Sequence, residues 1–197
     1  MVGVSGPMFA ESAAQGRRFM IGLTLGSLAG GVILATAAAV VGIGLARTGL
    51  PLGARLVMLI GVALILGLAD LANRTPQWFR QVPQRLVREL SPGTLGVVYG
   101  VDLGLIVTTK KVTSLWWLAI AGLALVSPVL LVIAVPVGAV ATSLAVWSWS
   151  LRIKGDTACL FRKNQRNWIT QLRLMSGTAM IVAAGLFAVL LVGHPLT

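Results

Sequence analysis

Long uncharged stretches of apolar residues dominate the chain, and short basic segments separate them. The first stretch runs from Phe19 to Ala46 without a charged side chain. A helix needs roughly 20 apolar residues, each adding about 1.5 Å, to cross the hydrocarbon core of a bilayer. The pattern therefore predicts an all-α integral membrane protein, a polytopic bundle with residues 1–18 as a cytoplasmic N-terminal segment and 19–197 as one transmembrane domain. Five spans are expected, at about 19–46, 50–72, 94–109, 112–151 and 174–193.

The region 112–151 leaves the number of spans open, because its 40 residues carry no charge and exceed one ordinary span. It forms either one long kinked helix or a hairpin of two helices, with the break near Pro128, Pro136 or Gly138. The bundle therefore has five or six spans. Tryptophans favour one long helix, because the pairs at 116–117 and 147–149 would mark its two membrane interfaces.

Basic residues distinguish the topologies, because Lys and Arg gather in cytoplasmic loops. Five continuous spans place twelve of them inside and four outside, whereas six spans give six against ten. A third arrangement makes 94–109 re-entrant and 112–151 a hairpin, and it gives fourteen against two. Charge alone slightly favours this third arrangement. We nevertheless rank five continuous spans first, since 94–109 lacks the proline break that re-entrant segments usually show.

Two basic cytoplasmic loops have the composition of lipid-surface segments. From Arg74 to Pro92 the apolar residues fall on one helical arc and the basic residues on the opposite arc, which predicts a cytoplasmic amphipathic helix. The net charge of +11 would indicate nucleic acid in a soluble protein, but no nucleic-acid motif accompanies it. Anionic lipid headgroups are therefore the expected partner. The residues predicted to contact them are Arg80, Arg85, Arg88, Arg162, Lys163 and Arg166.

Glycines repeat at every fourth residue in the first and third spans, and such a stripe lets another backbone approach closely. Two uses of the stripes remain open: helix packing within one chain, and association between copies or with other membrane subunits. Both spans run in the same direction in the expected topology. The stripes consist of Gly22, Gly26 and Gly30, and of Gly96, Gly100 and Gly104.

The third span also contains the clearest functional candidate, Asp102, midway between Thr94 and Lys110. A charged acid near the bilayer midplane costs at least about 2.5 kcal/mol, so it needs a partner or a proton. Tyr99 shares its helical face, nearly opposite the glycine stripe. The pair predicts either an intramembrane polar path for an ion, proton or substrate, or a structural bond from Asp102 to Tyr99 or Ser127.

Asp70 is the acid near the cytoplasmic end of the second span. Arg74 follows it at i+4, a spacing that favours an acid–base pair. We therefore expect Asp70 to have a structural role, with Arg74 as its partner.

The motifs of enzyme active sites are missing from the sequence. It contains no HExxH, GxSxG, Walker or Rossmann pattern. Its one cysteine, Cys159, and one histidine, His194, would lie on opposite sides of the membrane. No catalytic residue, cofactor site or metal site is therefore predicted, and the protein is not expected to be an enzyme.

The segment RQVPQRLVREL, followed by GVVYGVDLGLIVTT over Arg80–Thr109, resembles small actinobacterial membrane proteins. Those proteins are similar to the transmembrane domain of DsbD and cytochrome c biogenesis proteins. The resemblance implies the order of spans of that family without its first helix. The family works through paired membrane cysteines, and this chain has none in its spans, so thiol transfer is not implied.

Together these features predict a non-enzymatic membrane protein that serves transport, alone or as the membrane component of a transport system. The alternative is a structural or assembly subunit of a larger membrane complex. A third hypothesis is a membrane enzyme that acts on lipid or quinone with a partner's cofactor. High Gly, Ala and Arg usage indicates a bacterium, and hence the inner (plasma) membrane with a cytoplasmic N-terminus.

Overall fold

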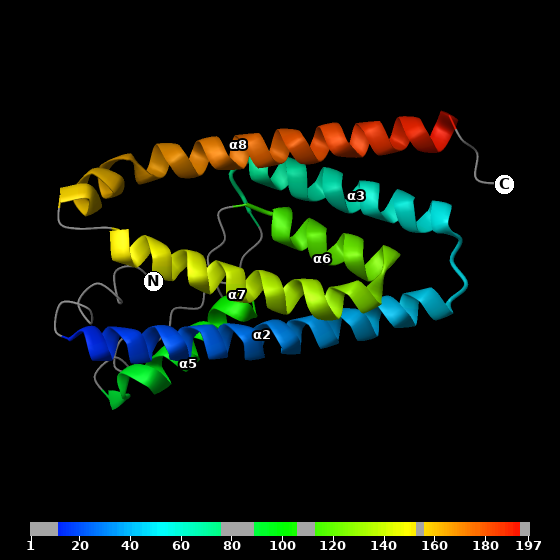
Figure 1. The fold of residues 1–197 in the computed structure, drawn as a ribbon. Coiled ribbons are helices and arrows are strands. Elements are labelled where there is room, and N and C mark those ends of the chain that lie inside the picture. Colours follow the sequence, from blue (N-terminus) through cyan, green and yellow to red (C-terminus); the bar gives the residue numbers. More distant parts are fainter. Residues whose placement is uncertain (1–11, 76–88, 106–112, 153–155, 194–197) are drawn as a thin grey trace. The chain divides into compact units, whose positions relative to one another are not determined.

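The computed structural model describes residues 12–75, 89–105, 113–152 and 156–193, and every regular element in these ranges is an α-helix (Figure 1). The fold class expected from the sequence is thus confirmed at the level of an all-helical protein. The helices are α2 (Ala13–Arg47), α3 (Leu52–Leu71), α5 (Pro92–Gly104), α6 (Leu115–Val126), α7 (Pro128–Arg152) and α8 (Asp156–Gly193).

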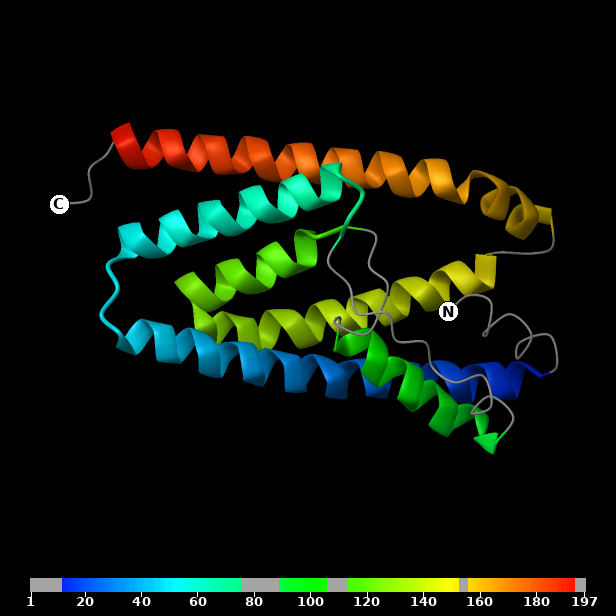
Figure 2. The same cartoon turned by 180° about the vertical axis from the view of Figure 1, so that it is seen from behind.

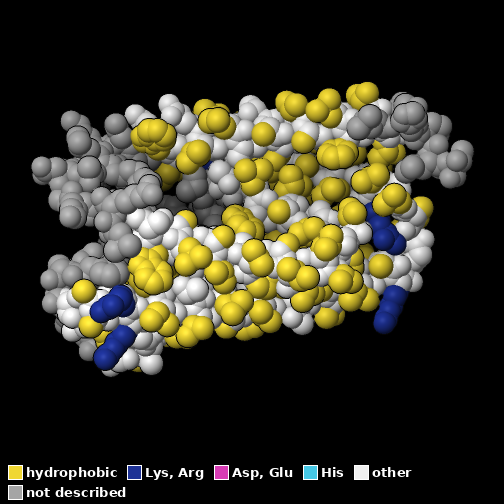
Figure 3. Space-filling model, in the orientation of Figure 1, with side chains coloured by type: hydrophobic (Ala, Val, Ile, Leu, Met, Phe, Trp, Pro, Cys, Tyr) yellow, Lys and Arg dark blue, Asp and Glu magenta, His cyan; other side chains and the backbone are white. Residues whose placement is uncertain are grey.

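Four of these helices are long and apolar enough to cross a membrane. The qualifying segments are Ala13–Arg47, Leu52–Leu71, Pro128–Ser148 and Asn167–Val189. Their outer faces expose many large hydrophobic side chains, such as Val40 at 64% and Ile65 at 69%. Soluble proteins rarely expose so large an apolar surface. In Figure 3 hydrophobic side chains cover the visible surface of α2, and basic ones appear at its two ends. These features are those of a multi-pass membrane protein.

The helices form two compact units. The first contains the N-terminal part of α2, α5 and most of α7. The second contains the C-terminal part of α2, α3, α6, the first residues of α7 and most of α8. The helices α2 and α7 each continue from one unit into the other, and Figure 2 shows the same helices from behind.

The region expected to form one long helix over 112–151 is two helices in the structure. Helix α6 ends at Val126, and Ser127 has φ −150° and ψ 79°, outside the helical region. The ring of Pro128 disfavours a helical conformation of the residue before it, and Pro128 itself starts α7 because a first helical residue needs no N–H partner. Pro136 lies inside α7 without ending it. The break is therefore at Pro128, one of the three positions expected.

The third expected span is also shorter than predicted. Helix α5 starts at Pro92, with Ser91 as its N-cap, whose hydroxyl accepts from the N–H of Thr94 at 3.4 Å. It ends at Gly104 after 13 residues, or about 20 Å, which is two-thirds of a hydrocarbon core. Residues 106–112, the remainder of the expected span and the segment after it, lie outside the described part of the chain.

A short turn joins α2 to α3 and closes the end of α2. Gly49 has φ +72°, the left-handed conformation in which helices commonly terminate. The side chain of Arg55 then reaches back to the exposed carbonyls at that end, donating to Leu50 O at 3.1 Å and to Ala46 O at 3.5 Å. A cation at a helix C-terminus is favoured by the helix dipole.

Candidate functional site

The two glycine stripes predicted from the sequence face one another in the first unit. Helices α2 and α5 lie side by side (Figures 1 and 2). A Cβ built on Gly96 would fall on the carbonyl of Phe19 and lie 2.9 Å from the amide nitrogen of Leu23. A Cβ on Gly100 would meet Leu23 O and the nitrogen of Ser27 at 2.8 Å. The two backbones are thus so close that only hydrogen fits between them.

The register of these contacts shows that α2 and α5 are parallel. Along α5, the neighbours of Gly96, Gly100 and Gly104 advance from Phe19 to Leu23 to Ser27 on α2. The glycines of α2 meet α5 in the same order, from Gly93 through Val97 to Val101. Both stripes are therefore used for packing within the chain.

Tyr99 packs its ring into an apolar cluster beside this interface. The cluster contains Phe19, Met20, Leu23 and Leu95, all with at most 1% of their surface exposed. The rings of Tyr99 and Phe19 meet edge to face, with centroids 6.3 Å apart and planes at 62°. The ring thus anchors α5 on α2.

Asp102 lies in the last turn of α5, not midway along a full span. It is half-buried, and the helix ends two residues later at Gly104. The depth of Asp102 in a membrane can be estimated from its neighbour α2. Gly30 of α2 packs against Val101 and Gly104, which flank Asp102 on α5. Gly30 follows Arg18 by twelve residues, or about 18 Å along the helix. If Arg18 marks the membrane surface, Asp102 lies near the midplane of a core about 30 Å thick.

Among the acids whose side chains the structure describes, Asp70, in the second unit, is the most completely buried, with 1% of its surface exposed. Its Oδ1 accepts from the hydroxyls of Thr75 at 2.8 Å and Ser114 at 2.7 Å. Its Oδ2 accepts from the backbone N–H of Ser114 at 2.8 Å and from the hydroxyl of Ser176 at 2.6 Å. We call Asp70, Thr75, Ser114 and Ser176 the Asp70 cluster.

The Asp70 cluster joins three helices. Asp70 is in the last turn of α3, Ser114 immediately precedes α6, and Ser176 lies within α8. The N–H of Ser114 belongs to the positive end of the α6 dipole, so the carboxylate lies where an anion is favoured. Four donors from the described residues face the carboxyl group, which is the arrangement that an ionised aspartate requires.

The sequence prediction for this site was wrong about the partner of Asp70. The i+4 spacing indicated Arg74, but Arg74 is exposed, and the hydroxyl groups of Thr75, Ser114 and Ser176 surround the acid. The local cause is Asn73, whose φ of +59° ends α3 in the left-handed conformation. The N–H of Arg74 then bonds back to Ala69 O at 2.7 Å, and the reversal brings Thr75 to Asp70.

A second polar contact supports the end of α3. Arg173, one turn before Ser176 on α8 and 7% exposed, donates from Nη1 to the backbone carbonyl of Asn73 at 3.1 Å and to its side-chain Oδ1. The carbonyls at a helix C-terminus lack intrahelical partners, so this arginine satisfies one of the acceptors beyond α3.

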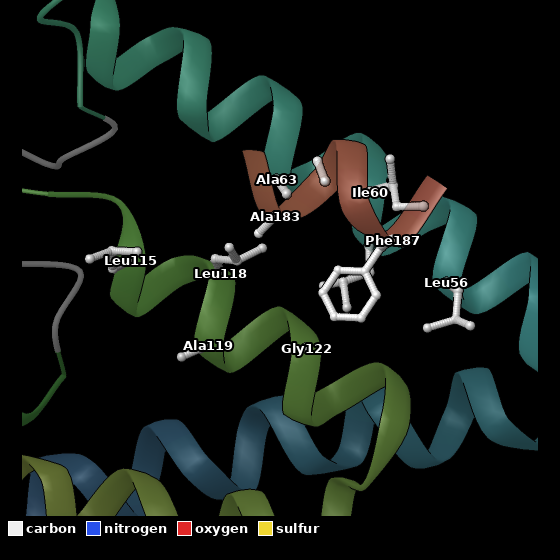
Figure 4. Close-up of a pocket in the computed structure, with 11 residues that line it drawn as sticks. Leu56, Ile60, Ala63, Leu115, Leu118, Ala119, Gly122, Ala183 and Phe187 are labelled. Carbon is white, nitrogen blue, oxygen red and sulfur yellow. The ribbon is translucent and has the colours of Figure 1, made fainter. Parts of the chain in front are cut away.

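An apolar cavity of about 320 Å³ lies in the same unit, between α3, α6 and α8. The small residues Ala63, Ala119 and Gly122 form part of its wall, and larger side chains such as Leu118 and Phe187 also line it. Figure 4 shows these residues on three different helices. All the lining residues are apolar, so the cavity offers no side-chain partner for a polar ligand.

The predicted lipid contacts fall in parts of the chain whose side chains are not described. They are Arg80, Arg85, Arg88, Arg162, Lys163 and Arg166, and the expected amphipathic helix at 74–92 lies almost wholly in the same parts. Their role therefore stays a prediction.

Comparisons with protein-family models, curated proteins and solved structures gave no match to this chain. The resemblance to the DsbD transmembrane family accordingly stays a prediction.

Proposed function

We propose that this chain is a small non-enzymatic transporter, or the membrane component of a transport system, in a bacterial plasma membrane. The observation that carries the proposal is the helix α5. It is too short to cross a membrane, packs by glycines against α2, and ends close to Asp102 at about the depth of the bilayer midplane. Interrupted helices that end at mid-depth are a recurring way for transporters to build ion and substrate sites.

The proposed topology follows the re-entrant arrangement. The bonds between Ser114 and Asp70 support it, because they put the start of α6 at the end of α3, on the same side of the membrane. Five or six continuous spans would separate these two residues by the thickness of the membrane. In this topology fourteen Lys and Arg are cytoplasmic and two, Arg47 and Arg55, are outside. The N-terminus is then cytoplasmic.

Asp102 is the proposed functional acid. Its carboxyl lies in the last turn of α5, where the helix dipole is negative and carbonyl oxygens lack intrahelical partners. Both features favour a proton or a cation over an anion. Tyr99, one turn earlier, positions α5 through its contact with Phe19.

Flux into proteoliposomes tests this proposal. The purified protein is reconstituted, and fluorescent indicators inside the vesicles record H⁺ and Na⁺ entry under imposed pH, Na⁺ and voltage gradients. We expect flux with the wild type and with Glu89→Gln, which removes an exposed carboxylate just before α5. Asp102→Asn should abolish it without changing thermal stability. Flux no greater than in empty vesicles, or full flux in Asp102→Asn, would overturn the proposal.

The alternative function, a structural or assembly subunit, would use the glycine stripes and the basic loops to dock a partner, and the absence of enzyme motifs is equally compatible with it. Helices α2 and α5 use both stripes on each other. That feature therefore no longer favours a docking role, and the transport proposal has the stronger support.

A further inference from the structure

A groove of about 370 Å³ lies in the first unit, between the N-terminal parts of α2 and α5. Its volume is within the range of small-molecule sites, roughly 300–1,000 Å³. Gly22 and Gly93 lie between its two walls and have no side chains to fill it. The walls consist of Arg18, Ile21 and Leu25 on α2, and of Thr94 and Val97 on α5.

The groove is polar at one end and apolar along the rest. Because α2 and α5 are parallel, Arg18 and Thr94 lie at the same end, and a Cβ built on Gly93 would lie 3.9 Å from the carbonyl of Arg18. Ile21 and Leu25 follow on α2, and they are 54% and 57% exposed. Leu25 comes seven residues after Arg18, or about 10 Å along the helix. The groove therefore matches an amphiphile with a polar head and a hydrocarbon chain.

The charge at the polar end comes from Arg18. Its side chain is exposed, and no partner for it is seen among the described residues. The start of α5 is already capped, because the hydroxyl of Ser91 accepts from the N–H of Thr94 at 3.4 Å. Arg17 and Glu89 are also exposed nearby in the sequence, but neither lines the groove. The lining thus offers one guanidinium and no carboxylate.

We propose that this groove binds one anionic phospholipid at the membrane surface. The lipid phosphate pairs with Arg18, because a guanidinium matches a phosphate with two parallel hydrogen bonds. One acyl chain lies along Ile21, Leu25 and Val97. The lining has no acid to pair with the ammonium group of a zwitterionic lipid, so a net negative headgroup is favoured. This site is separate from the basic loops predicted to contact lipid, and it goes beyond the transport proposal.

Binding is tested by native mass spectrometry of the whole protein, released from a neutral detergent. Phosphatidylglycerol is the anionic probe, and phosphatidylcholine with the same chains measures the contribution of the chains. Glycerol 3-phosphate measures the contribution of a phosphate without chains. We expect one phosphatidylglycerol to bind saturably, about tenfold tighter than phosphatidylcholine, since its charge is paired without a competing ammonium group. Glycerol 3-phosphate should not displace it.

Two pairs of variants separate the groove from its surroundings. Arg18→Gln should weaken phosphatidylglycerol binding by roughly tenfold and leave phosphatidylcholine binding unchanged. Arg17→Gln is the matched control, because it removes the same charge from an exposed neighbour outside the lining, and its effect should be less than twofold. Leu25→Gln should weaken the binding of both lipids. Leu28→Gln, at an exposed leucine of α2 outside the groove, should not.

Three results would overturn the proposal. Equal affinities for the two lipids would show that the headgroup is not recognised. Equal losses in Arg17→Gln and Arg18→Gln would mean a general attraction to the basic end of α2. Displacement by glycerol 3-phosphate would make this a site for small anions. Thermal unfolding of each variant checks its folding, and where Leu25→Gln does not fold, the two arginine variants decide. None of these results bears on flux through Asp102, so this inference and the transport proposal can fail separately.

Discussion

The hydroxyl oxygen of Ser176 lies 2.6 Å from Oδ2 of Asp70, although 106 residues separate the two along the chain. The contact ties α8 to the end of α3, and Ser114 brings the start of α6 to the same carboxylate. One buried acid thus joins the end of α3, the start of α6 and the middle of α8, three segments that lie far apart in the sequence.

Asp70→Asn should destabilise the protein strongly. The amide nitrogen brings two hydrogens into a place where all four neighbours donate, so buried donors lose their acceptor, each at about 1–3 kcal/mol. We expect a loss of about 2–4 kcal/mol in unfolding by denaturant in detergent. Glu89→Gln, at an exposed carboxylate, is the control and should change stability by less than about 0.5 kcal/mol. Equal stabilities of the two variants would contradict this account of the cluster.

Gly100→Ala should disrupt the packing of α5 on α2. Its Cβ would lie 2.8 Å from the nitrogen of Ser27 and even closer to a carbonyl of Leu23, and backbone atoms cannot move aside as side chains do. We expect a loss of at least about 2 kcal/mol, measured as thermal stability in detergent. Gly44→Ala on α2 provides the comparison, since no atom of the described residues lies within 4 Å of its added Cβ. A Gly100→Ala variant as stable as Gly44→Ala would refute the close approach.

Asn73→Val should weaken the end of α3. A β-branched residue at φ +59° is strained by about 1–2 kcal/mol, and the variant also removes a side-chain acceptor of Arg173. Asn73→Gly keeps the left-handed turn and should retain most of the stability. Chemical denaturation of the two variants side by side measures the difference. A valine variant as stable as the glycine variant would show that the turn is not strained as described.

Gly122→Ala should stabilise the protein modestly. Its Cβ would point into the apolar cavity and meet the Leu59 methyl groups at 3.6 and 3.9 Å, which is ordinary contact. Helix propensity alone contributes about 0.5–1 kcal/mol. Gly185→Ala on α8 measures that contribution, because its Cβ has no neighbour within 4 Å in the part of the chain that the structure describes. We expect Gly122→Ala to exceed Gly185→Ala in thermal stability. A decrease on filling this position would mean that the cavity is narrower than described.

Cysteine labelling distinguishes the proposed topology from five continuous spans. In a Cys159→Ser background, single substitutions Arg17→Cys, Thr48→Cys and Lys110→Cys are exposed to a membrane-impermeant maleimide on intact cells. We expect Thr48→Cys to be labelled at once, and the other two only after permeabilisation. Labelling of Lys110→Cys together with Thr48→Cys would instead support a continuous span over 94–109.

The sequence by itself determined that the protein is helical and apolar enough for a membrane, and it located most of the helices. The second span, expected at 50–72, is α3 at Leu52–Leu71, because its boundaries depend on local signals such as Pro51 and the basic residues that follow. The glycine stripes could also be recognised in the sequence, because a repeat of four residues is a local property of a single helix.

Only the tertiary structure decided where helices break and which residues meet. The break at Pro128 was one of several that the sequence allowed, and α5 ends without a proline, so its early end has no local signal. The hydrogen-bond partners of Asp70 could not be predicted from the sequence, because serine and threonine hydroxyls are common in membrane helices and usually bond to the backbone of their own helix. Their assembly around one carboxylate depends on three helices packing together, which is a long-range property that no spacing within a single segment records.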